Sequence, residues 1–424
     1  METPTEGPKS NLKFKCLFVL FGVVSLLAWN AILTKIEFFT YYVKNLQPYN
    51  SFSFLNFTLN IVLQFDFLWK KDLLKLKNQL YIGLIGSIIL LIVTPVVSYN
   101  LYSSHDSANF FFTALLILIM GLINALLSSG FFTLVSHFPL EDIVALSVGQ
   151  GFSGIIMNII QYIILATIEK ERRIVDAIIF FSISSFILLV SFICLIFSFK
   201  TEYFKYYLEK EDIFIDKVGK LTEGENEGNE ENENDNVENL MGDLAGKRKL
   251  TFIQIFKILK DIDLLCSFIY IITFAVFPVA FSEHVLFSLD GAYSINTLLI
   301  LYNFFDTFGR FLVSSITPTK MLTYITIISR AALLITFFLN SLFIGNKFSI
   351  YLTSILDIFN ISLLAITNGI GTTLCFGIAP TLVMDEYKGQ AGSTVSFFTI
   401  LGIFLGSCLQ FGTKEIKKIL ENRN

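Results

Sequence analysis

Long apolar segments follow one another along most of the chain and are separated by short polar stretches. A helix needs roughly 20 mostly apolar residues to cross about 30 Å of hydrocarbon. By this measure the sequence predicts about eleven membrane-spanning helices, at 14–36, 50–68, 80–99, 108–136, 143–167, 175–199, 264–282, 294–317, 321–343, 350–383 and 393–412. An odd number of spans places the two termini on opposite sides of the membrane.

One polar segment divides the predicted helices into six and five. Residues 221–245 carry nine acidic residues and no Lys or Arg, and such a stretch has too little apolar surface to fold. We interpret it as a solvated tether, with a regulatory or docking segment as the alternative. The predicted organisation is a cytoplasmic N-terminus at 1–13, a six-helix bundle at 14–199, a cytoplasmic and largely disordered acidic loop at 200–261, a five-helix bundle at 262–413 and a short tail at 414–424.

Basic residues in the loops predict the orientation. Lys and Arg are more frequent in the segments on the side of the N-terminus, which favours a cytoplasmic N-terminus by the positive-inside rule. Lys170, Arg173 and the C-terminal lysines run against this bias. We expect a multi-pass protein of the plasma membrane.

Composition supports a lipid environment. The 424-residue chain is 54% hydrophobic and only 16% charged, whereas soluble domains hold about 25% charged residues. A net charge of −4 provides no basic patch for nucleic acid. The five Cys show no short-interval pairing, the three His are isolated, and the sequence has no zinc-protease, nucleophile-elbow or P-loop motif. We therefore predict no metal, no cofactor, no catalytic residues and no obligate protein partner.

Charged residues stand inside one predicted span. Each costs about 2.5–3.5 kcal/mol there, so its presence invites a functional interpretation. Asp306 and Arg310 are four residues apart and share a helix face with Asn303. The stripe predicts the lining of a polar cavity, and a salt bridge that locks two helices is the alternative. Arg330 has no acidic neighbour at helical spacing, which favours a partner on another helix or snorkelling.

Two further polar sites lie among small or aromatic residues. Gln150 is set between glycines, including Gly149 and Gly154, that let neighbouring backbones approach closely. Its amide can read the edge of a nucleobase, or it can simply join two helices. Trp29 and Asn30 lie deep in the first span, where they suit a platform for a planar ligand or packing against a helix.

Glycine and proline mark places where helices bend or pack closely. Pro278 interrupts the seventh span, and Gly369 and Pro380 stand in the long tenth segment. Irregular backbone at membrane depth is tolerated where it lines protein or a water-filled cavity. We expect bending or close packing at these positions and at Gly309.

The motifs, taken in order, resemble the equilibrative nucleoside transporter family. They cover nearly the whole chain. They are WN at Trp29 and Asn30, a glycine-studded fourth span ending in FP at Phe138 and Pro139, GQGFSG at 149–154, FP at Phe277 and Pro278, N-x-x-D-x-x-x-R from Asn303 to Arg310 with Gly309 inside it, NG at Asn368 and Gly369, and AP at Ala379 and Pro380. The chain departs from the family at Ala28, where Pro is frequent, and at Tyr302, where Phe is common.

The resemblance implies an all-α, major-facilitator-like fold that moves nucleosides, and also nucleobases, by alternating access for purine and pyrimidine salvage. By motif position, Asp306 and Arg310 would hold the ribose hydroxyls and Gln150 the base. Trp29 would pack against the nucleoside, with Asn30, Asn303 and Phe277 nearby. The abundance of Phe, Ile, Asn and Lys would suit a protozoan parasite.

Other functions remain as alternatives at this stage. The main one is a major-facilitator-type transporter of another small organic solute, such as a sugar. An intramembrane enzyme would need a nucleophile with its base or a metal cluster, and a channel would need repeated pore-lining rings. Proton coupling stays open, with Asp306, Asp357, Asp66 and Glu37 as the groups that could titrate.

Overall fold

The computed structural model describes residues 8–43, 48–70, 74–101, 106–168, 172–208, 250–276, 291–316, 318–326, 328–330, 333 and 350–421. Within these ranges all regular structure is helical, as the sequence predicts. The main helices are α1 Leu12–Thr34, α2 Ile36–Tyr42, α3 Pro48–Trp69, α4 Leu76–Asn100, α5 Asp106–Val135, α6 Leu140–Thr167, α7 Arg173–Ser198, α10 Phe252–Val276, α12 Gly291–Leu312, α14 Ile350–Ile378 and α15 Lys388–Glu421.

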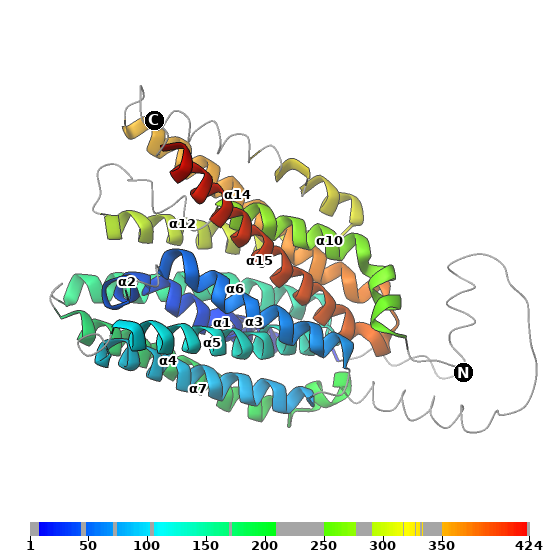
Figure 1. Cartoon of the computed structure of the whole chain (residues 1–424). Coiled ribbons are helices and arrows are strands. Elements are labelled where there is room, and N and C mark those ends of the chain that lie inside the picture. Colours follow the sequence, from blue (N-terminus) through cyan, green and yellow to red (C-terminus); the bar gives the residue numbers. More distant parts are fainter. Residues whose placement is uncertain are drawn as a thin grey trace, which may run out of the picture.

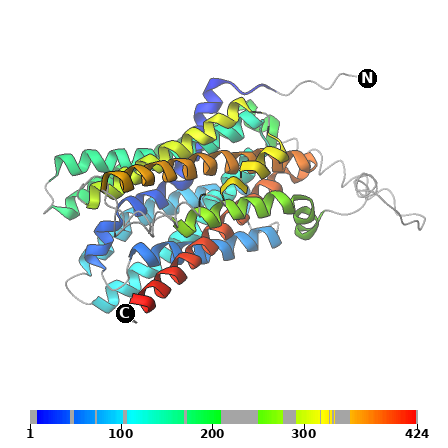
Figure 2. The same ribbon diagram turned by 90° about the horizontal axis from the view of Figure 1, so that it is seen from above.

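The helices form two layers (Figure 1). One layer holds α1 to α7, and the other holds α10, α12, α14 and α15. The view from above shows the helices running along a common long direction (Figure 2). Helix α6 packs on α12 across the interface, and α15 packs on α3 and α5. The two layers contain the described helices of the predicted six-helix and five-helix bundles.

The outward faces of the helices are apolar, which is the reverse of a water-soluble bundle. On α4, Ile85, Ile89 and Ile92 recur at helical spacing and are about half exposed, while Ser87 and Leu91 are buried on the opposite face. Eight described helices are long and apolar enough to cross a membrane: α1, α3 to α7, α14 and α15. The chain is therefore a multi-pass membrane protein.

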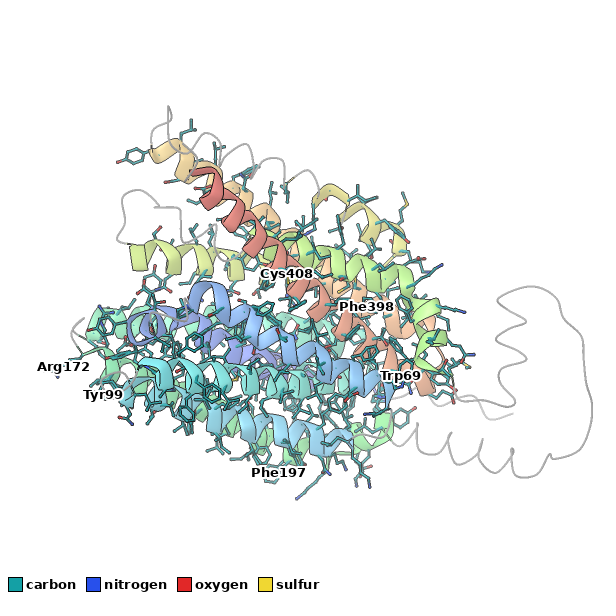
Figure 3. All side chains as sticks on the ribbon, in the orientation of Figure 1. Trp69, Tyr99, Arg172, Phe197, Phe398 and Cys408 are labelled. Carbon is teal, nitrogen blue, oxygen red and sulfur yellow. The ribbon has the colours of Figure 1, made fainter. Side chains whose placement is uncertain are left out.

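Aromatic side chains mark the two ends of the molecule (Figure 3). Exposed Trp69 lies at one end, and exposed Tyr99 lies with Arg172 at the other. Amphipathic aromatic rings prefer the level of the lipid headgroups. Tyr99 stands near the end of α4, whose 25 residues extend about 37 Å and can cross the bilayer from one interface to the other.

The described chain begins and ends at opposite ends of the bundle. The Tyr207 hydroxyl, beyond α7, donates to the Pro8 carbonyl at 2.9 Å. Gly389, at the start of α15, lies against His137, which follows α5. Helix α15 then runs for 34 residues, about 50 Å, to Glu421. We call the two ends of the molecule the Pro8 end and the Glu421 end.

Glycines allow the closest helix contacts. A Cβ on Gly149 would overlap the Val19 carbonyl of α1, and one on Gly369 would overlap the Asp306 carbonyl of α12. Gly309 lies against the Ile366 carbonyl in the same way, and Gly154 lies against the Asn303 side chain. These four glycines therefore serve close packing rather than bending.

Helix α14 is continuous through Gly369, so no unwinding occurs there. It ends at Ile378, and Pro380 stands in the short 3₁₀ turn Ala379–Leu382 that follows. Proline lacks the N–H that a continuing helix would need. Pro380 thus stands where the regular helix stops.

Helices extend into both ends of the segment expected as a loop at 200–261. Residues 202–208 are helical, and α10 begins at Phe252, ten residues before the predicted start of the second bundle. Residues 209–249 lie outside the described residues, and so do Phe277, Pro278 and most of the predicted ninth span. The proposed roles of Phe277 and Pro278 stay predictions.

Candidate functional site

A cavity of about 140 Å³ lies between the two layers. Side chains from α1, α3, α5, α6, α10, α12, α14 and α15 line it. Six of the seven residues expected to bind substrate are among them: Trp29, Asn30, Gln150, Asn303, Asp306 and Arg310. The tertiary structure thus brings together residues that are up to 281 positions apart in the chain.

An ion pair between Asp306 and Arg310 stands in this cavity. Arg310 Nε donates to Asp306 Oδ2 at 2.7 Å, and both side chains are about 4% exposed. Asn368 Nδ2 donates to the other carboxylate oxygen, Oδ1, at 2.7 Å. A buried ion pair is tolerated when further hydrogen bonds satisfy its remaining atoms, and Asn368 supplies one of them.

Arg310 also reaches across to the other layer. Its Nη1 donates to the Ser147 carbonyl at 3.2 Å, to Ser147 Oγ at 3.0 Å and to Gln150 Oε1 at 3.2 Å. Within the described part of the chain, Nη2 has no hydrogen-bond partner. The guanidinium therefore joins α12 to α6 and keeps donor capacity for a ligand.

Gln150 and Trp29 are held by their neighbours. Gln150 Nε2 donates to Ser25 Oγ of α1 at 3.2 Å, so the amide lies between α1 and Arg310. The Trp29 ring meets Phe57 edge-on, with centroids 5.3 Å apart. Next to it, Asn30 Nδ2 donates to Ser153 Oγ at 3.0 Å. These contacts fix an aromatic wall and an amide on the α1 and α6 side of the cavity.

Three asparagines of the lining have unsatisfied polar atoms. Asn56 Nδ2, Asn124 Oδ1 and Asn158 Oδ1 are buried and have no hydrogen-bond partner among the described residues. Buried polar atoms in native proteins are normally paired. Because these atoms have almost no accessible surface, a polar ligand could pair with them only when the cavity widens.

Sequence reasoning missed most of these amides. Asn56, Asn60 and Gln64 interrupt the apolar sequence of the predicted second span, and their spacing of four places them on one helix face. Asn368 entered the sequence analysis only as part of the NG motif, which does not indicate a contact with Asp306. Asn124 and Asn158 stand among other polar residues of their spans, and no local pattern distinguishes them.

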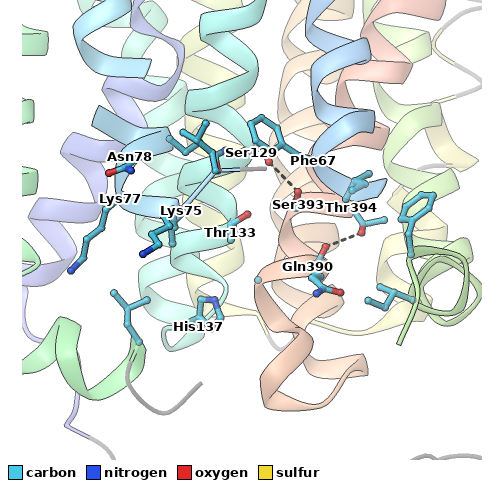
Figure 4. Close-up of a pocket in the computed structure, with 18 of the residues that line it drawn as sticks. Phe67, Lys75, Lys77, Asn78, Ser129, Thr133, His137, Gln390, Ser393 and Thr394 are labelled. Carbon is cyan, nitrogen blue, oxygen red and sulfur yellow. Dashed lines mark hydrogen bonds between the residues drawn. The ribbon is translucent and has the colours of Figure 1, made fainter. Parts of the chain in front are cut away.

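A larger hollow of about 740 Å³ opens at the Pro8 end, and we call it the vestibule (Figure 4). Its lining includes Lys75, Lys77 and His137 from the first layer and Gln390 from the second. Burial, together with the nearby positive charge of Lys388, lowers the pKa of His137 to about 4. No group of His, Cys, Asp and Glu that could hold a metal ion occurs in the described residues.

Three contacts between the layers separate the vestibule from the cavity. The rings of Phe132 and Phe376 stack, Ser129 Oγ and Ser393 Oγ share a hydrogen bond of 3.0 Å, and Ser396 Oγ donates to Gln64 Oε1 at 3.2 Å. We call these six residues the septum. Phe132, Phe376 and Ser396 line the cavity, whereas Ser129 and Ser393 line the vestibule.

Two helical layers around a central cavity form the major facilitator fold, and solved structures share this fold. The chain matches a proton:xylose symporter of that superfamily, bound to a bromodeoxyglucose, with a TM-score of 0.65 and 11% identity, over 96% of this chain and 89% of the other. It also matches the Escherichia coli fucose:proton symporter with a TM-score of 0.54 and 13% identity, over 97% and 93%.

The sequence places the chain within this class. Residues 113–414 match the family described as nucleoside transporter, and the chain belongs to that family. Equilibrative nucleotide transporter 7 of Arabidopsis thaliana is 25% identical over 95% of this chain and 94% of its own length. Human equilibrative nucleoside transporter 1 is 24% identical over 78% of this chain and 75% of its own length. The chain is thus a transporter and not an enzyme.

Proposed function

We propose that the cavity of about 140 Å³ is the nucleoside-binding site of this transporter. Asp306 and Arg310 bind the ribose hydroxyls, Gln150 binds the base, and Trp29 packs against the nucleoside. The observation that supports this assignment best is the position of Arg310, which contacts Asp306 on its own helix and Gln150 on the opposite layer. A ligand beside it would meet all three groups.

The side chains supply the chemistry that a nucleoside needs. A ribose diol both donates and accepts hydrogen bonds, and a carboxylate beside a guanidinium matches it. Asp306 retains acceptor capacity because a carboxylate offers about four lone-pair sites, and Arg310 retains Nη2. The amide of Gln150 can donate to one base atom and accept from its neighbour. Asn30 and Asn303 complete the polar lining.

The size of the cavity favours alternating access. Pockets that bind small ligands usually measure about 300–1,000 Å³, so a cavity of about 140 Å³ must widen to admit a nucleoside. Widening separates the layers and breaks the contacts from Arg310 to Ser147 and Gln150. The vestibule provides the route to the Pro8 end once the septum opens.

We assign the Pro8 end to the cytoplasm and the protein to the plasma membrane. Lys75 and Lys77 lie at that end and line the vestibule, in agreement with the positive-inside rule. Leu208, the last described residue before the acidic segment, also lines the vestibule. The vestibule would then open to the cytoplasm.

Uptake into proteoliposomes tests the proposal. The protein should take up labelled adenosine and inosine saturably, and Arg310→Ala and Asp306→Ala should each reduce uptake more than about tenfold, because removing one partner leaves a buried charge uncompensated. Thr167→Ala is the control, since Thr167 is exposed and bonds only its own helix. Normal uptake by both folded variants would remove these residues from the site.

Competition separates the proposal from its alternative. Unlabelled nucleosides should displace the labelled one, and xylose or fucose in large excess should not. Inhibition by sugars alone would favour a sugar transporter. The same assay at two external pH values separates downhill transport from proton-coupled transport, because only the latter accumulates substrate in response to a pH gradient.

A further inference from the structure

Arg330 is a second arginine buried in the layer that holds Asp306. Its side chain is 0% exposed, and within the described part of the chain it makes no ion pair. Its Nη1 donates to the Leu364 carbonyl at 3.0 Å and to Thr367 Oγ1 at 2.9 Å. Its Nη2 donates to the Ile269 carbonyl at 3.2 Å and to Thr273 Oγ1 at 2.5 Å. The guanidinium thus bridges α10 and α14.

One of these contacts continues to the substrate site. Thr273 Oγ1 donates to Asn368 Oδ1 at 2.9 Å, and Asn368 Nδ2 donates to Asp306 Oδ1 at 2.7 Å. Thr273, Asn368 and Asp306 are each at most 4% exposed, so little water competes for the bonds. An unbroken chain of hydrogen bonds therefore joins Arg330 to the Asp306 carboxylate.

The chemistry of arginine fixes the direction of the first bond in this chain. A guanidinium only donates, so the Thr273 oxygen must accept from Arg330 and its proton points away. Two acceptors lie 2.9 Å from this hydroxyl, the Ile269 carbonyl and Asn368 Oδ1. When Asn368 Oδ1 accepts the proton, the Nδ2 group is the end of the amide that donates to Asp306. Hydrogen bonds aligned in this way strengthen one another in a low-dielectric interior.

We propose that Arg330 is a positioning residue for the substrate site, which acts through Thr273 and Asn368 to orient the Asp306 carboxylate toward a ribose that carries both hydroxyls. The inference rests on the proposed function, because Asp306 must bind the ribose for its orientation to matter. A merely structural Arg330, which ties α10 to α14, would leave substrate selectivity unchanged.

Two threonines provide a matched test. Thr273 and Thr367 both accept a hydrogen bond from Arg330, and both hydroxyls also contact a carbonyl of their own helix. Only Thr273 continues to Asn368. Thr273→Val therefore interrupts the chain to Asp306, and Thr367→Val removes an equivalent Arg330 contact without interrupting it.

The readout is selectivity for the ribose hydroxyls. Half-saturation is measured in proteoliposomes for inosine, and inhibition of inosine uptake is measured for 2′,3′-dideoxyinosine. Thr273→Val should weaken the apparent affinity for inosine about fivefold, in the range of one hydrogen bond, and leave that for the dideoxy analogue unchanged. Thr367→Val should change neither value. Thr273→Ser, which keeps the hydroxyl, should restore the wild-type ratio.

Each outcome decides between the roles. Arg330 has no positioning role if Thr273→Val and Thr367→Val give the same apparent affinities. The same conclusion follows if Thr273→Val weakens the apparent affinities for inosine and for 2′,3′-dideoxyinosine equally. Thr273→Ala removes the same hydroxyl and replaces the valine variant if that variant does not fold. Asp306→Asn tests the underlying assignment separately. If it leaves the inosine to dideoxyinosine ratio unchanged, the ribose site itself is wrong.

Discussion

Phe132 and Phe376 stack face to face, with ring centroids 3.5 Å apart and an interplanar angle of 9°. Phe132 belongs to α5 in one layer and Phe376 to α14 in the other. The stack is the aromatic part of the septum, which stands between the substrate cavity and the vestibule. If the cavity binds substrate as proposed, we expect these two rings to separate when substrate passes to the vestibule.

Truncation of the stack should open the route from the Pro8 end. An aromatic pair is worth about 0.5–1.5 kcal/mol beyond its buried area, so Phe132→Ala should shift the equilibrium toward the open septum by about two- to tenfold. A cysteine placed at Ser128, in the cavity lining, should then react that much faster with an impermeant thiol reagent in inside-out vesicles. Mass spectrometry of the modified peptide measures the rate.

The control for this experiment is Phe111→Ala. Phe111 lies on α5, is 60% exposed, and pairs with Phe112 outside the cavity lining. Phe111→Ala should leave the rate of modification of the cysteine at position 128 unchanged. An equal rate in Phe132→Ala and in the parent protein would show that the stack does not limit access.

Replacement of Gln150 should weaken substrate binding more than it affects folding. Gln150→Ala removes the amide proposed to bind the base and one acceptor of Arg310, so we expect half-saturation for nucleosides to rise about tenfold, the equivalent of one charge-assisted hydrogen bond. Gln390→Ala is the matched control, because Gln390 lines the vestibule and not the cavity. Concentration-dependent uptake measures both. An unchanged half-saturation would place the base elsewhere.

Alanine at Gly369 should destabilise the folded protein. The added Cβ would overlap the Asp306 carbonyl, and a backbone atom in a packed helix cannot move aside as a side chain can. We expect a loss of at least about 1–3 kcal/mol in stability, the usual cost of overpacking. In Gly86→Ala the nearest atom is the flexible end of Ile123, so that variant should be nearly unaffected. Thermal melting in detergent compares the two. Equal melting midpoints would contradict the proposed close contact.

His137 should contribute to acid sensitivity. Its pKa is lowered to about 4 in the folded protein, whereas an unfolded histidine titrates near 6.5. Between these values the unfolded chain binds more protons, so stability decreases as the pH falls from 6.5 to 4. His137→Asn should lose less stability over this interval than the parent protein. Melting midpoints measured at several pH values give the pH dependence of stability for the variant and for the parent protein. The same pH dependence in both would show that His137 does not contribute to the loss of stability in acid.

Helical spacing in the sequence predicts contacts within one helix but not contacts between helices, as the Asp306–Arg310 ion pair shows. The spacing of Asp306 and Arg310 alone predicted a pair on one helix face, and the structure confirms it at 2.7 Å. The partners of that pair could not be predicted in the same way. Asn368 is 62 residues from Asp306, and Ser147 is 163 residues from Arg310. Helical periodicity says which face is polar, but it does not say which helix lies opposite.

The sequence by itself determined that the chain spans a membrane, where most of its helices lie and which helix carries the buried charges, because hydrophobicity and helical spacing are local properties. Only the tertiary structure decided that Asn368 and Gln150 meet that ion pair, that Arg330 is connected to it, and that Phe132 and Phe376 stack between cavity and vestibule. The physical reason is that these contacts depend on how separate helices pack, and close packing at glycines such as Gly149 and Gly369 sets which side chains face each other.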